Sequence, residues 1–131
     1  MDITIHLKAE PMAFTSFESL LVWQKSSDVY GRVHDIRFTP KYRHLQDQLL
    51  RSTLSISSNI AEGYERIHIK EVVYFLNVAK GSSGEARSPV LIAGRFGIIE
   101  QVFANELVSE YSEISKMLYG LIQAKMKQGK G

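Results

Sequence analysis

The sequence has no cysteine, only three prolines and no long hydrophobic run among its 131 residues. Without cysteine, the chain forms no disulfide, no thiolate metal site and no cysteine nucleophile. No apolar stretch reaches the roughly 18 residues that a membrane-spanning helix needs, and no basic segment followed by an apolar one opens the sequence. We therefore expect a soluble, cytoplasmic protein without a membrane partner.

An excess of one charge is also lacking, because 16 basic side chains stand against 14 acidic ones and leave a net charge of +2. This balance does not by itself indicate nucleic-acid binding. Two basic groups nevertheless stand out, with Arg37, Lys41 and Arg43 around one predicted turn and Lys125 and Lys127 near the C-terminus. Each group is either ordinary solvated surface or a set of phosphate contacts.

The residues that are plentiful are hydrophobic ones, 44% of the chain, which recur at helical spacing in four stretches. The predicted helices begin near Phe17, at Lys41, near Ile69, and between Gln101 and Asn105. We expect a capping box between Thr15 and Glu18 to start the first helix. Four helices with short connections favour an all-α, antiparallel up-down-up-down four-helix bundle over residues 16–127. Residues 1–15 are expected to form an extended or disordered arm, and residues 128–131 a disordered tail.

The second predicted helix carries an unusual polar stripe beside its apolar one. Helical spacing places five polar residues along this stripe: Gln48, Arg51, Ser55, Asn59 and Glu62. Burying such groups without partners costs about 1–3 kcal/mol each, so the stripe requires water or answering groups. Two interpretations follow: an internal polar network that fixes helix register or a subunit contact, or a groove or pore that binds a ligand or nucleic acid.

The same stretch resembles the signature of a bacterial family, the 23S rRNA intervening-sequence proteins, also labelled the S23 ribosomal protein family. The motif here is Gln48-x-x-Arg51-x-x-x-Ser55-Ile56-x-x-Asn59-Ile60-Ala61-Glu62-Gly63. Upstream, Leu20-x-Val22-Trp23-Gln24-Lys25 is similar to the family, as are Phe75-Leu76-x-x-Ala79-x-Gly81-Ser82, Glu85 and Arg87 downstream. The resemblance covers roughly residues 17 to 125 and implies a four-helix bundle.

For the third helix, the resemblance and the local rules disagree. Gly81-Ser82-Ser83-Gly84 is typical of a turn, and Pro89 of a helix break. The resemblance implies one long helix, whose small residues let a neighbouring helix approach and let Arg51 reach Glu85. We therefore predict a continuous third helix with a bend or local break between Gly84 and Pro89, and we add Glu85 to the polar network.

The sequence carries few motifs that indicate catalytic chemistry. Glu65-x-x-His68 has metal-ligand spacing, but bundle di-metal sites need this motif twice, and it occurs once, where a helix is expected to end. The serines have neither a nucleophile elbow nor a base, and no phosphate-binding loop is present. We therefore predict no catalytic residue, no metal site, no cofactor and no enzymatic activity.

Assembly and partner are implied by the resemblance alone. Proteins of this family, and the related accessory proteins of diversity-generating retroelements, are similar in forming ring-shaped homopentamers. A ring would repeat the basic residues around its axis, with Tyr42, Tyr64 and Phe103 as candidates for the subunit contact. The leading hypothesis is a non-enzymatic oligomer that binds structured RNA or a ribonucleoprotein. The alternative is a protein–protein interaction scaffold that binds no nucleic acid.

Overall fold

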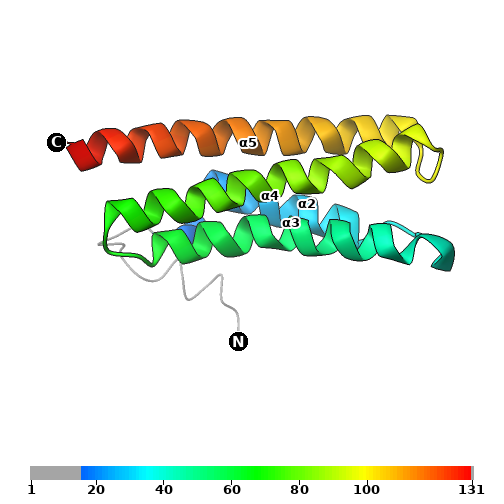
Figure 1. Ribbon diagram of the computed structural model, residues 1–131, viewed down its shortest axis with the longest axis horizontal. Helices are drawn as coiled ribbons and strands as arrows, with labels where there is room; N and C mark the ends of the chain where they lie inside the picture. The colour runs from blue at the N-terminus through cyan, green and yellow to red at the C-terminus, as the bar shows by residue number, and fades with distance from the viewer. Residues whose placement is uncertain (1–15, 131) are drawn as a thin grey trace.

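The computed structural model describes residues 16–130, which contain four α-helices, two short 3₁₀ helices and no strand. The α-helices are α2 (Leu21–His34), α3 (Arg43–Tyr64), α4 (Ile69–Arg95) and α5 (Gln101–Lys130), and the 3₁₀ helices are η1 (Phe17–Ser19) and η2 (Pro40–Tyr42). Figure 1 shows successive helices running in opposite directions along one long axis. The predicted all-α four-helix bundle is therefore confirmed. The arm predicted for residues 1–15 lies outside the described residues.

The first helix begins later than predicted. Thr15 lies outside the described residues, and the Ser16 side chain instead accepts a hydrogen bond from the backbone N–H of Glu18, which caps η1. Leu20 then adopts an extended backbone, so α2 starts only at Leu21. At the start of α2, Leu21 is 70% exposed while its neighbour Val22 is buried, so the core-facing side of the helix begins at Val22.

The core is a single cluster drawn from all four α-helices. Its largest buried side chain is Tyr111 of α5, whose hydroxyl lies 2.6 Å from that of Thr53 on α3. Several buried hydroxyls are satisfied within their own helix. Ser26, for example, donates to the carbonyl of Val22 at 2.7 Å. Such local bonds let small polar residues occupy a core without a network between helices.

Helix α4 runs without interruption through the Gly81–Gly84 stretch and through Pro89, so the predicted continuous helix is confirmed and the alternative of a local break is wrong. Proline removes one backbone N–H, and the carbonyl of Glu85 loses that donor. Pro89 is buried, and α4 buries a row of mostly small residues on either side of it: Ala79, Ser82, Ser83, Ala86, Val90, Ala93 and Gly94. Packing against α3 and α5 thus holds a helix that local propensity disfavours.

The glycines that permit close helix approach are not the predicted ones. A Cβ added at Gly81 or Gly84 would meet no atom of another element within 4 Å. A Cβ at Gly63 would lie 3.1 Å from Cβ of Phe75, and one at Gly94 would lie 2.7 Å from Cβ of Ala104. Close packing therefore occurs near the two ends of α4.

Helix α5 continues to Lys130, so residues 128–130 are helical where we expected a disordered tail. At 1.5 Å per residue, its 30 residues span roughly 45 Å. This helix runs the full length of the bundle and connects its two ends. Between residues 16 and 130 no helix combines the length and the apolar character needed to cross a membrane.

Candidate functional site

The basic residues of the α2–α3 connection lie at one end of the bundle. Arg37, Lys41 and Arg43 are all exposed, and they occupy the loop after α2, the short helix η2 and the first position of α3. Figure 1 places this connection at the same end as the α4–α5 turn. Arg95, the last residue of α4, is also exposed there. Four cations are thus presented by two neighbouring connections.

The other predicted contacts, Lys125 and Lys127, lie at the opposite end. The ammonium of Lys125 sits 5.1 Å from the centroid of the Tyr64 ring, where α3 ends. From Ala104, level with the end of α4, to Lys125, helix α5 advances roughly 30 Å at 1.5 Å per residue. One protomer therefore does not combine the two basic groups into one contact surface.

An open pocket of about 670 Å³ adjoins the first basic group. Its inner part is apolar and half-buried, and it consists of Ile36, Ile98, Ile99 and Phe103. The charged residues around it are Arg32, Asp35, Arg37 and Glu100. The volume is within the range of about 300–1,000 Å³ that is usual for ligand sites. Arg37 belongs both to this pocket and to the basic group.

Local backbone geometry delivers Ile98 and Ile99 to the pocket. Gly97 adopts a φ of 69°, the left-handed conformation that favours glycine. The N–H of Ile98 then donates to the carbonyl of Ala93 at 2.8 Å, and the N–H of Gly97 to that of Gly94 at 3.3 Å. This pair of bonds is the Schellman motif, which ends α4 and reverses the chain toward α5.

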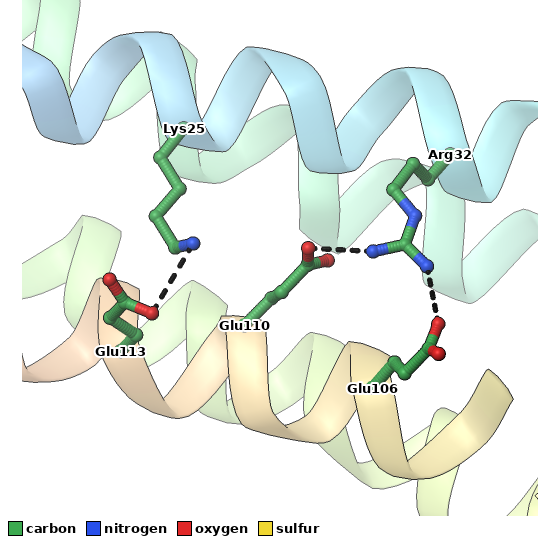
Figure 2. A network of polar contacts seen from close by, with 5 residues as sticks. All are labelled: Lys25, Arg32, Glu106, Glu110 and Glu113. Carbon is green, nitrogen blue, oxygen red and sulfur yellow. Dashed lines mark hydrogen bonds and ion pairs between the residues drawn. The ribbon is translucent and has the colours of Figure 1, made fainter. Parts of the chain in front are cut away.

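Arg32 fixes the pocket wall by binding two carboxylates of α5. Figure 2 shows its guanidinium reaching Glu110 at 2.6 Å and Glu106 at 2.9 Å, with Lys25 and Glu113 forming a separate pair at 3.4 Å. The guanidinium carbon also lies 5.2 Å from the centroid of the Phe103 ring. Burial acts to lower the pKa of Arg32, but the hydrogen bonds and charges of Glu106 and Glu110 outweigh it and raise the pKa. Arg32 is therefore held as a fixed cation.

The predicted polar stripe is mostly on the surface. Gln48, Arg51, Glu62 and Glu85 are exposed, and no ion pair links Arg51 to Glu85 within the described part of the chain. The expected Arg51–Glu85 contact is therefore wrong. Glu62 instead pairs with Arg66 one turn along the chain, at 3.2 Å.

Only the middle of the stripe forms a contact between helices. The Ser55 hydroxyl lies 2.8 Å from that of Ser82 on α4, and Asn59 donates to Ser55 Oγ at 3.0 Å. Both Ser55 and Asn59 are half-buried. Of the predicted network, only Ser55 and Asn59 take part in this contact, and their partner on α4 is Ser82, which was not predicted.

The Glu65 and His68 pair does not share a helix face. Glu65 caps the C-terminus of α3 and His68 caps the N-terminus of α4, and both are exposed. Across residues 16–130 no three histidine, aspartate or glutamate side chains come together as metal ligands would. The two residues therefore end one helix and begin the next, so they do not form the single-helix motif that the spacing indicated.

Of the residues that line the pocket, the sequence identified only Arg37 as a binding residue. Arg32 and Glu110 are 78 positions apart, so no local pattern pairs them. Phe103 was considered only as a subunit contact. The one available signal was charge: Glu106, Glu110 and Glu113 follow at helical spacing on α5, and such a row predicts cations on the facing helix.

Comparison with known proteins identifies the family to which the chain belongs. Residues 18–120 match the family described as 23S rRNA-intervening sequence protein. The chain belongs to this family. The match covers α2 through most of α5, and therefore both connections that border the pocket. The resemblance drawn from the Gln48–Gly63 signature is confirmed.

A solved structure supports the family's fold. It is a protein of unknown function from the S23 ribosomal protein family of Bacteroides thetaiotaomicron, with a TM-score of 0.69 and 22% sequence identity. The similarity covers 78% of this chain and 98% of that chain. At this identity the likeness establishes the bundle and nothing finer. No curated protein matches the chain.

Proposed function

We propose that this member of the intervening-sequence family is a non-enzymatic, oligomeric protein that binds structured RNA or a ribonucleoprotein. The observation that carries the proposal is the exposed group of Arg37, Lys41 and Arg43, set beside a pocket at one end of the bundle. Cations that are free to move in solvent suit the phosphate backbone, which supplies most of the affinity in nucleic-acid binding. The family's description in terms of a 23S rRNA intervening sequence supports an RNA partner.

Oligomerisation would make this small basic group sufficient for binding RNA at physiological salt. Three cations on one protomer give weak attraction at physiological salt, whereas the same group repeated by rotation binds one RNA at several points. The family resemblance suggests a pentameric ring. A surface suited to subunit contact lies at the same end, where α4 and α5 expose four large apolar residues: Leu91, Ile92, Phe96 and Val102. Exposed apolar groups of this kind are typical of protein interfaces.

The non-enzymatic part of the proposal rests on how the charged groups of the site are used. Arg32, Glu106 and Glu110 hold one another and position α2 against α5. Their hydrogen-bonding atoms are thus engaged in holding two helices together. The geometry therefore favours binding over acid–base chemistry.

The test compares two matched triple variants. In one, Arg37, Lys41 and Arg43 become glutamine; in the other, Lys125, Lys127 and Lys130 do. Each variant removes three positive charges, so a difference between them reports position and not net charge. We would measure binding to a folded ribosomal RNA fragment and to duplex DNA over a salt series, with the mass of the assembly determined in the same buffer.

We expect the first variant to lose RNA affinity by at least tenfold at low salt, and the second to stay close to the unsubstituted protein. Equal losses would show that the RNA does not select this end. If the intact oligomer binds no RNA at low salt, the proposal fails. The exposed apolar residues Leu91, Ile92, Phe96 and Val102 then favour the alternative, a scaffold that binds another protein.

A further inference from the structure

The geometry points to a role for the pocket in recognition: it receives one unpaired nucleobase of the bound RNA. This inference rests on the proposed RNA-binding function and specifies the class of RNA. It assigns recognition to the pocket residues and leaves phosphate attraction to Lys41 and Arg43, which lie outside the pocket.

The pocket has the polarity pattern that a base requires. Half-buried Ile36, Ile98, Ile99 and Phe103 give it an apolar interior, while exposed Asp35 and Glu100 place carboxylates at its edge. A nucleobase is flat and apolar on its faces and carries amino and imino donors on its edges. Carboxylates accept hydrogen bonds from such donors, and the amino group of cytosine is the standard example.

One wall is planar and fixed before any ligand arrives. Arg32 is bound at 2.6 Å by Glu110 and at 2.9 Å by Glu106, so its guanidinium is held beside the Phe103 ring at 5.2 Å from the ring centroid. Aromatic rings and guanidinium planes are the two kinds of protein surface on which unstacked bases pack. Because the ion pairs already order Arg32, stacking there costs little side-chain entropy.

Arg37 connects the pocket to the phosphate contacts. It lines the pocket, it is exposed, and the basic loop continues from it to Lys41 and Arg43. A base in the pocket therefore leaves its own backbone close to these cations. This continuity favours a base within an RNA strand over a free nucleotide, which would use Arg37 alone.

Base pairing decides which RNA fits. A paired base hides its edge in its partner and its faces in the stack, so it offers nothing to Asp35, Glu100 or Phe103. An unpaired base in a bulge or loop exposes both its edge and its two faces to these side chains. The pocket therefore selects RNA with at least one unstacked nucleotide beside a helix.

The experiment compares an RNA hairpin that carries one bulged nucleotide with the same hairpin fully paired, each of the four bases being placed in the bulge in turn. We expect the bulged form to bind about tenfold tighter, since stacking of one base on an aromatic side chain is a large enough effect. F103L should abolish the preference and leave binding of the paired hairpin unchanged, whereas F103Y should retain it. Y119L is the matched control, an exposed aromatic elsewhere on α5.

A second variant leaves the half-buried Phe103 ring unchanged and alters the carboxylates of the pocket instead. Asp35 and Glu100 are exposed, so D35N with E100Q should fold normally and should change which of the four bulged bases binds best. Equal binding of bulged and paired hairpins by the unsubstituted protein would overturn the inference and leave the proposed function intact. Equal losses in F103L and Y119L would also overturn it. Absence of binding to every RNA would instead remove the proposed function itself.

Discussion

Gly94 occupies a position where α4 meets α5 too closely for a side chain. A Cβ there would lie 2.7 Å from Cβ of Ala104, well inside van der Waals contact. We expect G94A to lower the free energy of unfolding by about 1–3 kcal/mol, the usual cost of overpacking.

G81A is the control, because Gly81 is exposed in the same helix and its added Cβ would meet nothing within 4 Å. It should stabilise the protein by up to about 1 kcal/mol. Chemical denaturation of both variants measures the difference, and equal effects would contradict this account of Gly94.

Tyr111 makes stability depend on pH in the alkaline range. Burial of its hydroxyl raises the pKa from 10.0 to about 12, against a small opposing effect of the Thr53 hydrogen bond. Below pH 10 the group is protonated in both states. Between about pH 10 and 12 the unfolded chain releases this proton while the folded protein retains it, so stability falls as pH rises, by about 2–3 kcal/mol for a shift of this size.

The measurement is the free energy of unfolding at about pH 9 and about pH 11, for the unsubstituted protein and Y111F. Y111F should be less stable at the lower pH, because it removes the hydrogen bond at 2.6 Å between the Tyr111 and Thr53 hydroxyls, but its stability should fall less between the two pH values. Y74F substitutes an exposed tyrosine and should follow the unsubstituted protein. The same pH dependence in Y111F as in the unsubstituted protein would exclude Tyr111 as its source.

The buried hydroxyls explain why the polar residues of α3 were misjudged from sequence. Ser52 donates to the carbonyl of Gln48 at 2.8 Å and Thr53 to that of Leu49 at 2.7 Å, so these core residues need no partner on another helix. Helical spacing separates one stripe from its neighbour but does not say which of two adjoining stripes faces the core. The larger polar residues, such as Arg51, were the ones left in solvent.

At the scale of elements, α2 is a short helix that ion pairs from Lys25 and Arg32 link to α5. Arg32 contacts Glu110, whose side chain is only 26% exposed, whereas Lys25 contacts Glu113, which is 61% exposed. Removing Arg32 leaves a partly buried carboxylate without its partner, and a second oxygen of Glu110 already has none among the described residues. Removing Lys25 leaves a carboxylate that water solvates.

We therefore expect R32M to destabilise the protein by about 1–2 kcal/mol and K25M by less than about 0.5 kcal/mol. Hydrogen exchange should place the change in α2, with amides of residues 21–34 exchanging faster in R32M while those of α3 and α4 keep their protection. Equal destabilisation by the two variants would show that the Arg32 pairs act only as surface charges. Uniform loss of protection over all four helices would contradict a local role.

Helix identities were predictable, but the start of the first helix and the continuity of the third through Pro89 were not. The bundle, the start of α4 at Ile69 and the start of α5 at Gln101 follow from apolar periodicity and from turns. The first helix was misplaced because Thr15-x-x-Glu18 matches a capping box, yet the cap forms at Ser16 and serves η1. The effect of Pro89 was mispredicted because proline destabilises a helix through local backbone effects. Here tertiary packing against two neighbouring helices stabilises the helix in spite of them.

At the scale of the whole molecule, the pocket could not be predicted from the sequence because two distant segments build it. Ile36 follows α2, whereas Ile98, Ile99 and Phe103 belong to the Gly97 turn and the first turn of α5. Each is an unremarkable apolar residue in its own segment. The basic loop beside the pocket was predictable, because Arg37, Lys41 and Arg43 are close in sequence; their distance from Lys125 and Lys127 follows only from the direction of α5.

The salt dependence of RNA binding measures how many protomers act together. Each phosphate neutralised contributes about −0.7 to −0.9 to the slope of log K against log salt, so the three cations of one protomer give a slope of about −2 to −3. A ring that presents Arg37, Lys41 and Arg43 from several subunits to one RNA should give a multiple of this value. The variant with glutamine at these three positions should then be nearly insensitive to salt, while glutamine at Lys125, Lys127 and Lys130 should leave the slope unchanged. A slope no steeper than −3 for an assembly whose mass shows several subunits would mean that each RNA meets a single protomer, and the repeated surface would then contribute no avidity.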